Sequence, residues 1–117
     1  MSEKMYKVEI ITKNRKLEDL KDGLNEIGIT GMTVTQVLGC GMQKGKTQYY
    51  RGNQYKLDLL PKVKVEVVVS TIPVEQVIAV AKKVLGSSEI GSGKIFVSEI
   101  QNAIRIRTGE EGPDALS

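Results

Sequence analysis

Apolar and polar residues alternate along the first segment of the chain, from Tyr6 to Ile11. A period of two, together with β-branched residues, predicts a half-buried strand. We expect Asn14 to cap the helix that follows and Gly28 to end it. The apolar residues of this helix recur at helical spacing and share one side: Leu17, Leu20, Leu24 and Ile27.

Threonines and apolar residues alternate again over residues 32–37, which predicts a second strand. For the helix of the second half, we expect Thr71 to be the cap, Pro73 to lie in the first turn and Gly86 to end the helix. The second half repeats the order strand, helix, strand: residues 63–69 and 94–100 are the expected strands, and the expected helix lies between Thr71 and Gly86.

This order predicts an α+β fold, an α/β sandwich with the ferredoxin-like double β-α-β topology. A chain of 117 residues fits a single domain, 1–117. We expect both helices to cover one face of the sheet. The open face then needs a partner, which favours self-association.

The two halves are joined by a long segment, about residues 38–61, which exceeds an ordinary connection. Glycines and basic residues are interleaved in it, and few of its side chains suit a core. We therefore predict a functional loop, with a flexible β-hairpin carrying incidental tyrosines as the alternative. Three of the four tyrosines in the chain lie here: Tyr49, Tyr50 and Tyr55.

Composition excludes several kinds of chemistry. The chain has no histidine and one cysteine, Cys40, which excludes histidine-dependent triads, histidine metal sites and an intrachain disulfide. Seventeen basic and 14 acidic residues give a net charge of +3, too mild for a dedicated nucleic-acid binder. No apolar run approaches the roughly 20 residues of a membrane span, and no apolar signal segment follows Met1, so we expect a cytoplasmic protein.

Four short patterns are candidates for binding a nucleotide. Residues 39–47 combine glycines and lysines but lack the spacing and the following helix of a Walker A loop. Residues 91–94 (Gly-Ser-Gly-Lys) suit a phosphate, although glycine-rich turns are common. Arg105 and Arg107 would share one face of an extended segment and suit phosphate, although a charged strand edge has the same spacing. Glu66 lies among valines. It is a candidate to accept a hydrogen bond from a ribose hydroxyl or to pair with an arginine across the sheet, and the alternative is that it simply faces solvent.

Together these patterns predict a nucleotide-binding site. They do not predict an enzyme, because no positioned base or activated nucleophile can be assembled from them. They also contain no acidic pair suited to a catalytic two-metal site.

Several segments resemble the PII nitrogen-regulatory signal proteins, and the resemblance runs from about Lys7 to Glu110. It implies a ferredoxin-like homotrimer that binds ATP or ADP between subunits. Such a protein reports nitrogen, carbon and energy status to other proteins without catalysis. The resemblance is carried by residues 28–35, 43–52, 60–64, 90–97 and 103–110.

The resemblance also implies roles for single residues. Gln43 would ligate Mg²⁺ and meet 2-oxoglutarate, and Lys62 would pair with that acid. Tyr55 matches a uridylylation or adenylylation site of some bacterial members. The loop of about residues 38–61 would contact partners, and residues 108–117 would form a C-terminal tail. The implied nucleotide contacts are Thr33, Gly39, Gly41, Met42, Gln43, Glu66, Val68, Gly91, Ser92, Gly93, Lys94, Arg105 and Arg107, of which Thr33, Glu66 and Val68 would meet the nucleoside.

Among the departures from the family pattern, Met42 stands where an arginine usually reaches the phosphates, and Ser92 replaces a common aspartate. The implied partners are an ammonium channel, a biosynthetic enzyme or a nitrogen regulator. No nucleic acid is implied, and a membrane would be met only through a channel. Two alternatives come from other classes: an RNA-binding module of the same topology, which needs aromatic residues on its central strands, and a slow ATPase.

Overall fold

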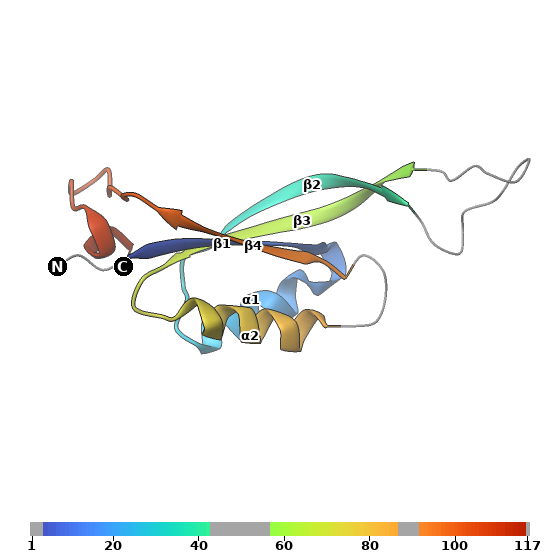
Figure 1. Ribbon diagram of the computed structural model, residues 1–117, viewed down its shortest axis with the longest axis horizontal. Helices are drawn as coiled ribbons and strands as arrows, with labels where there is room; N and C mark the ends of the chain where they lie inside the picture. Colours follow the sequence, from blue (N-terminus) through green and yellow to red (C-terminus); the bar gives the residue numbers. More distant parts are fainter. Residues whose placement is uncertain (1–3, 43–56, 87–91, 117) are drawn as a thin grey trace, which may run out of the picture.

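The computed structural model describes residues 4–42, 57–86 and 92–116. Two β-α-β units follow one another, as predicted, and a short 3-10 helix closes the described chain (Figure 1). The elements are β1 (Met5–Lys13), the 3-10 turn η1 (Asn14–Lys16), α1 (Leu17–Glu26), β2 (Thr33–Met42), β3 (Leu57–Val69), α2 (Val74–Leu85), β4 (Lys94–Ile100) and the 3-10 helix η2 (Gly112–Leu116).

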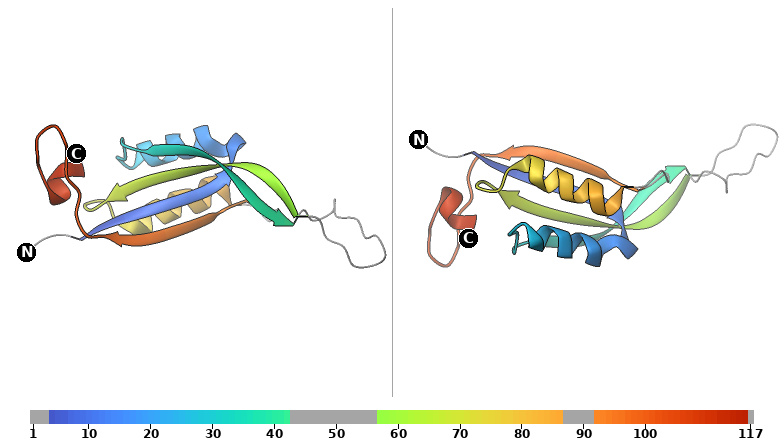
Figure 2. Two further views of the ribbon diagram at one scale, coloured as in Figure 1. Left: turned by 90° about the horizontal axis from the view of Figure 1, so that it is seen from above. Right: turned by 90° about the horizontal axis from the view of Figure 1, so that it is seen from below.

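The four strands form one antiparallel sheet with the order β2-β3-β1-β4. Strands β1 and β3 are therefore central, and β2 and β4 are the edges. Both helices lie against the same face of the sheet, and the other face is open (Figures 1 and 2). This arrangement confirms the predicted ferredoxin-like α+β fold.

The core fills the layer between the sheet and the helices. Residues 63, 65, 67 and 69 of β3 are all valines and all buried, which is the alternation expected of a sheet with one covered face. Each fully buried aliphatic side chain contributes about 1.5–3 kcal/mol relative to an exposed one. The buried residues that meet these valines are Val8, Ile10, Leu20, Leu24, Ile29, Val77, Ala81 and Leu85.

Helix α1 ends at a glycine, as predicted. Gly28 has a φ of +98°, which strongly favours glycine. Its N–H donates to the carbonyl of Asn25 at 3.0 Å, and the N–H of Ile29 donates to the carbonyl of Leu24 at 3.1 Å. These two bonds are the Schellman pattern, which satisfies carbonyls at the end of a helix.

Both predicted helix caps are wrong. Asn14 begins the η1 turn, so that Lys16 stands at the start of α1, without a side-chain cap. At α2, the chain enters the helix from Pro73, whose carbonyl accepts from the N–H of Gln76 at 3.0 Å, and Thr71 lies outside. A preceding 3-10 turn and a proline each set the entry of the chain without a polar side chain.

The predicted loop of residues 38–61 is too long, because both strands extend into it. Residues 38–42 of β2 pair with residues 57–61 of β3, and we call this two-stranded ribbon the arm. Strand β1 pairs with β3 only as far as Lys62, so Pro61 lies where β3 has one described neighbour, a place that tolerates proline. The rest of the predicted loop, residues 43–56, lies outside the described residues.

Neither α1 nor α2 is long and apolar enough to cross a lipid bilayer, and the same holds for every other helix among the described residues.

Replacing Gly28 by alanine should lower the free energy of unfolding by about 1–2 kcal/mol, the cost of a left-handed backbone for a residue with a β-carbon. The nearest atom, the Ile72 methyl, would be 3.6 Å away, so the cost is conformational. The control is Gly31→Ala, which meets nothing within 4 Å at an ordinary φ and should change stability little. Urea unfolding of the two variants measures the difference, and equal stabilities would contradict the prediction.

Candidate functional site

The register of the sheet brings the three predicted nucleoside contacts together on the open face. Thr33 of β2 lies opposite Glu66 of β3, and Val68 lies two residues further along β3. Side chains two apart on a strand share a face, so all three belong to one surface. On β1, Glu9 lies opposite Glu66 and extends the row across a third strand.

A lysine joins the two facing glutamates. The Lys7 ammonium nitrogen is 3.5 Å from a carboxylate oxygen of Glu9 and 3.6 Å from one of Glu66. The hydrogen bond with Glu66 holds the pKa of Glu9 below its usual value, desolvation opposes this, and the nearby Lys7 lowers it further. Glu66 is thus held by a lysine and a second carboxyl group. The predicted alternative of a cross-sheet arginine is wrong.

Another part of the predicted site lies at the base of the arm. Lys62 is opposite Val37, and its side chain runs across the backbone of Gly39, where a β-carbon would come 3.3 Å from the Lys62 Cγ. Gly41 and Met42 continue β2 from there. Residues 39–42 are therefore strand, where a loop was predicted. Gln43, Tyr55 and Gly91 lie outside the described residues.

The start of β4 is attached to the end of β1. The buried Thr12 hydroxyl donates to the carbonyl of Ser92 at 2.7 Å. Gly93 has a φ of +136°, and a β-carbon there would lie 2.4 Å from the carbonyl oxygen of Ile11. Lys94 follows as the exposed first residue of β4, opposite Ile11.

A hollow of about 120 Å³ lies beside this segment. Its lining includes apolar side chains and the start of β4. Ligand pockets usually measure about 300–1,000 Å³. This hollow alone is therefore too small to enclose a nucleotide.

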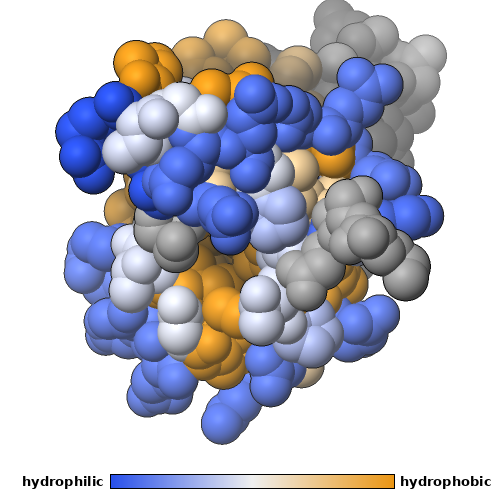
Figure 3. All heavy atoms as spheres, turned by 90° about the vertical axis from the view of Figure 1, so that its left-hand side faces the viewer, coloured by the Kyte–Doolittle hydropathy of each residue, from blue (hydrophilic) through white to orange (hydrophobic). Residues whose placement is uncertain are grey.

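The C-terminal segment, residues 101–116, folds back on itself. The Arg105 guanidinium pairs with the Glu110 carboxylate, which also accepts from the Thr108 hydroxyl at 2.9 Å. The Arg105 N–H donates to the carbonyl of Glu110 at 2.9 Å, and residues 106–108 form a turn. Because of that turn, the prediction of an extended segment presenting Arg105 and Arg107 on one face is wrong. Hydrophilic side chains cover much of this end of the molecule, and apolar surface shows on the helix side (Figure 3).

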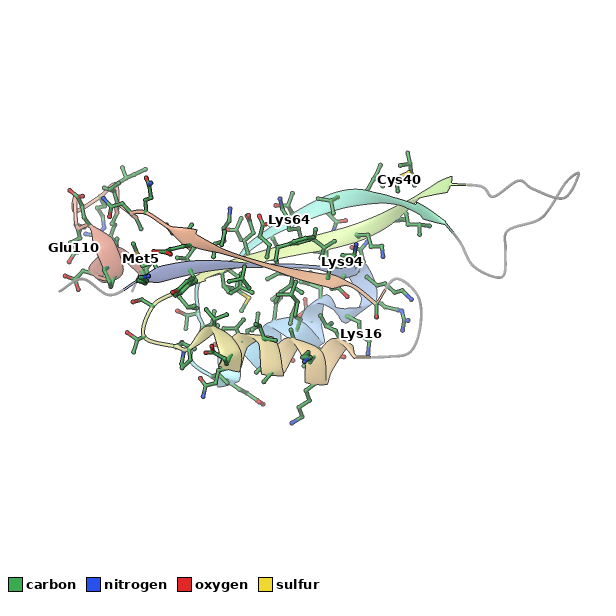
Figure 4. The ribbon with its side chains drawn as sticks, in the orientation of Figure 1. Met5, Lys16, Cys40, Lys64, Lys94 and Glu110 are labelled. Carbon is green, nitrogen blue, oxygen red and sulfur yellow. The ribbon has the colours of Figure 1, made fainter. Side chains whose placement is uncertain are left out.

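The predicted phosphate contacts lie at opposite ends of one chain. Strand β4 runs from Lys94 at one end to Ile100, just before the segment that holds Arg105. Seven extended residues span about 20 Å. Figure 4 shows Lys94 beside the start of β4 and Glu110, the partner of Arg105, at the far end. One chain therefore does not bring the two groups of phosphate contacts together.

Three residues were missed from the sequence: Lys7 and Glu9 on the open face, and Thr12 on the buried face of β1. Thr12 had a signal, because it follows Val8 and Ile10 at a position where strand alternation calls for an apolar side chain. Lys7 and Glu9 had none, since only the pairing of β1 with β3 shows what they face.

Comparison with known proteins identifies the family of this chain. The family model described as nitrogen regulatory protein P-II matches residues 5–110. A nitrogen regulatory PII-like protein of Bacillus subtilis is 51% identical over 116 residues, which cover 99% of this chain and 100% of the relative. A nitrogen regulatory protein P-II of Pasteurella multocida is 51% identical over 112 residues, or 96% and 100%.

Solved structures are similarly close. The complex of Bacillus subtilis GlnK with ATP has a TM-score of 0.83 and 48% identity, covering 99% of each chain. A further structure of Bacillus subtilis GlnK has a TM-score of 0.83 and 50% identity, covering 97% of this chain and 99% of that one. The chain belongs to the P-II family of nitrogen regulatory proteins.

Proposed function

We propose that this chain is a non-catalytic signal transducer that forms a homotrimer and binds ATP or ADP in the clefts between subunits. The observation that carries the proposal is the separation of Lys94 from Arg105 by the length of β4. A polyphosphate meets both groups when Lys94 comes from one protomer and Arg105 from the next. The ATP complex of the similar GlnK supports the choice of nucleotide.

The two groups differ in what they offer a nucleotide. Ser92, Gly93 and Lys94 offer backbone and an ammonium group to phosphates. Arg105 and Arg107 add guanidinium charge from beyond the far end of β4, and the row of Thr33, Glu66 and Val68 lies on the open face of the same chain. We assign the nucleoside to that row, where Glu66 is suited to accept hydrogen bonds from ribose hydroxyls.

Lys62 is the proposed contact for 2-oxoglutarate. It lies at the base of the arm, one row beyond Lys64 and within the same stretch as Gly39. A keto acid, the nucleotide phosphates and the Gln43 amide would supply the oxygen ligands that Mg²⁺ prefers. Binding of 2-oxoglutarate at Lys62 would then affect the start of the partner-contacting segment.

The segment that the arm carries is the proposed contact with target proteins. An ammonium channel, a biosynthetic enzyme or a nitrogen regulator is the proposed class of target, and the cytoplasm, where ATP is abundant, is the proposed location. Tyr55 is the proposed modification site. A membrane would be met only through a channel.

The two alternatives are less well supported. On the central strands β1 and β3, the described residues that face the open side are lysines, glutamates and aliphatic residues, so stacking platforms for RNA bases are missing there. Among the described residues we find no activated nucleophile or free-standing base near Lys94, which disfavours a slow ATPase.

Lys94→Ala should weaken ATP binding about ten- to a hundredfold, since an ammonium–phosphate contact is charge-assisted. Adenosine binding should change little. Calorimetric titration measures both, with Lys83→Ala, an exposed lysine of α2, as the control. If the wild-type protein binds neither ATP nor ADP at millimolar nucleotide, the proposed function is refuted. If Lys94→Ala loses affinity for ATP and for adenosine equally, the role of Lys94 is refuted.

Mixed trimers of Lys94→Ala and Arg105→Ala protomers should regain wild-type ATP affinity at a fraction of their sites. Each parent variant alone lacks one contact at every site, whereas some clefts of the mixture join an intact Lys94 to an intact Arg105. The control mixes Lys94→Ala with the double variant, where no cleft holds both groups. Titration after joint refolding tests this, and no recovery over the control would show that each site lies within one chain.

Lys62→Ala should weaken 2-oxoglutarate binding at saturating Mg-ATP about ten- to a hundredfold, because a carboxylate loses its ammonium partner. ATP affinity should stay near that of wild type. Lys64→Ala, two residues along the same face of β3, serves as the matched control in the same titration. If both variants bind 2-oxoglutarate equally well, the acid binds elsewhere.

A further inference from the structure

Thr12 occupies an unusual place for a hydroxyl group. It follows Val8 and Ile10 on the helix-facing side of β1, and only 1% of its surface is exposed. Among the described residues, it is the one buried polar side chain. Valine has the same shape without the hydroxyl and would suit the surrounding apolar layer.

A buried hydroxyl without a partner costs free energy, so the use of Thr12 depends on what it bonds. Its Oγ1 donates at 2.7 Å to the carbonyl of Ser92, a residue 80 positions further along the chain. The bond therefore joins the end of a central strand to the segment that leads into the edge strand β4.

Gly93 supplies a second constraint at the same place. A β-carbon on Gly93 would lie 2.4 Å from the Ile11 carbonyl oxygen and 3.3 Å from both Cβ and Oγ1 of Thr12. The backbone of Gly93 thus lies directly against β1, as close as a residue without a side chain allows. Ser92, just before Gly93, accepts the hydrogen bond from Thr12, and Lys94, just after it, pairs with Ile11 of β1. The segment therefore has little freedom to shift.

We propose that Thr12 is a positioning residue, which shapes the Ser92–Lys94 segment for the nucleotide phosphates through its bond to the Ser92 carbonyl. The inference rests on the proposed nucleotide-binding function. Thr12 faces the core, whereas Lys94 is exposed on the open side of the sheet, so Thr12 acts without touching the ligand. Its effect should fall on the phosphates and spare the nucleoside, which we assign to the row of Thr33 and Glu66, separated from β4 by strand β1.

The test compares Thr12→Val with Thr12→Ser in titrations of ATP and of adenosine. Valine keeps the shape and removes the hydroxyl, so ATP affinity should fall about tenfold while adenosine affinity stays within about twofold. Serine keeps the hydroxyl and should retain ATP affinity. Should the valine variant not fold, Thr12→Ala removes the same bond, and thermal unfolding identifies the folded variants.

Three results would overturn the inference: wild-type ATP affinity in Thr12→Val, equal losses for ATP and adenosine, or a serine variant as weak as the valine variant. Failure of the proposed function is distinct, because wild-type protein then binds no ATP. The tether is also measured without nucleotide, by amide hydrogen exchange at Gly93 and Lys94. Exchange should be faster in Thr12→Val than in wild type and Thr12→Ser, and equal rates would refute the tether.

Discussion

The arrangement of the molecule depends on a sheet that is covered on one side only. Valines at every second position of β3 bind both helices to one face, which leaves the intervening positions without cover from the chain itself. On that open face, charge is balanced locally, as Lys7 does between Glu9 and Glu66. The candidate binding residues lie on this face, at the arm or at the two ends of β4. The face that contributes least to the core therefore holds many of the candidate ligand contacts.

A site assembled from two chains ties ligand occupancy to association. With the start of β4 and the Arg105 segment about 20 Å apart, a nucleotide bound in the proposed site would stabilise the contact between protomers as well as its own binding. Arg105 is paired with Glu110, so in the proposed site an incoming phosphate would replace one anionic partner of the guanidinium by another.

Hydrophobic periodicity predicted both helices, all four strands and the end of α1 at Gly28, because those features depend on local spacing. Prediction from spacing failed where strand pairing or another contact overrode the local pattern. Gly39, Gly41 and Pro61 disfavour strands by propensity, yet the pairing of β2 with β3 overrides them. The two-residue spacing of Arg105 and Arg107 concealed a turn that Glu110 closes. Thr12 could be recognised as unusual, but its partner Ser92 becomes visible only in three dimensions.

The arm has a mechanical consequence. Past Lys62 it is a ribbon of two strands, with five residue pairs beyond the last contact of β3 with β1. Five pairs extend about 17 Å, so a rotation of about 10° at the base moves the far end by about 3 Å. In the proposed function the ribbon would act as a lever arm whose base lies at Gly39 and Lys62, where the lysine side chain lies against the glycine backbone. A small change there would be amplified into a larger displacement of the segment that is the proposed contact with target proteins.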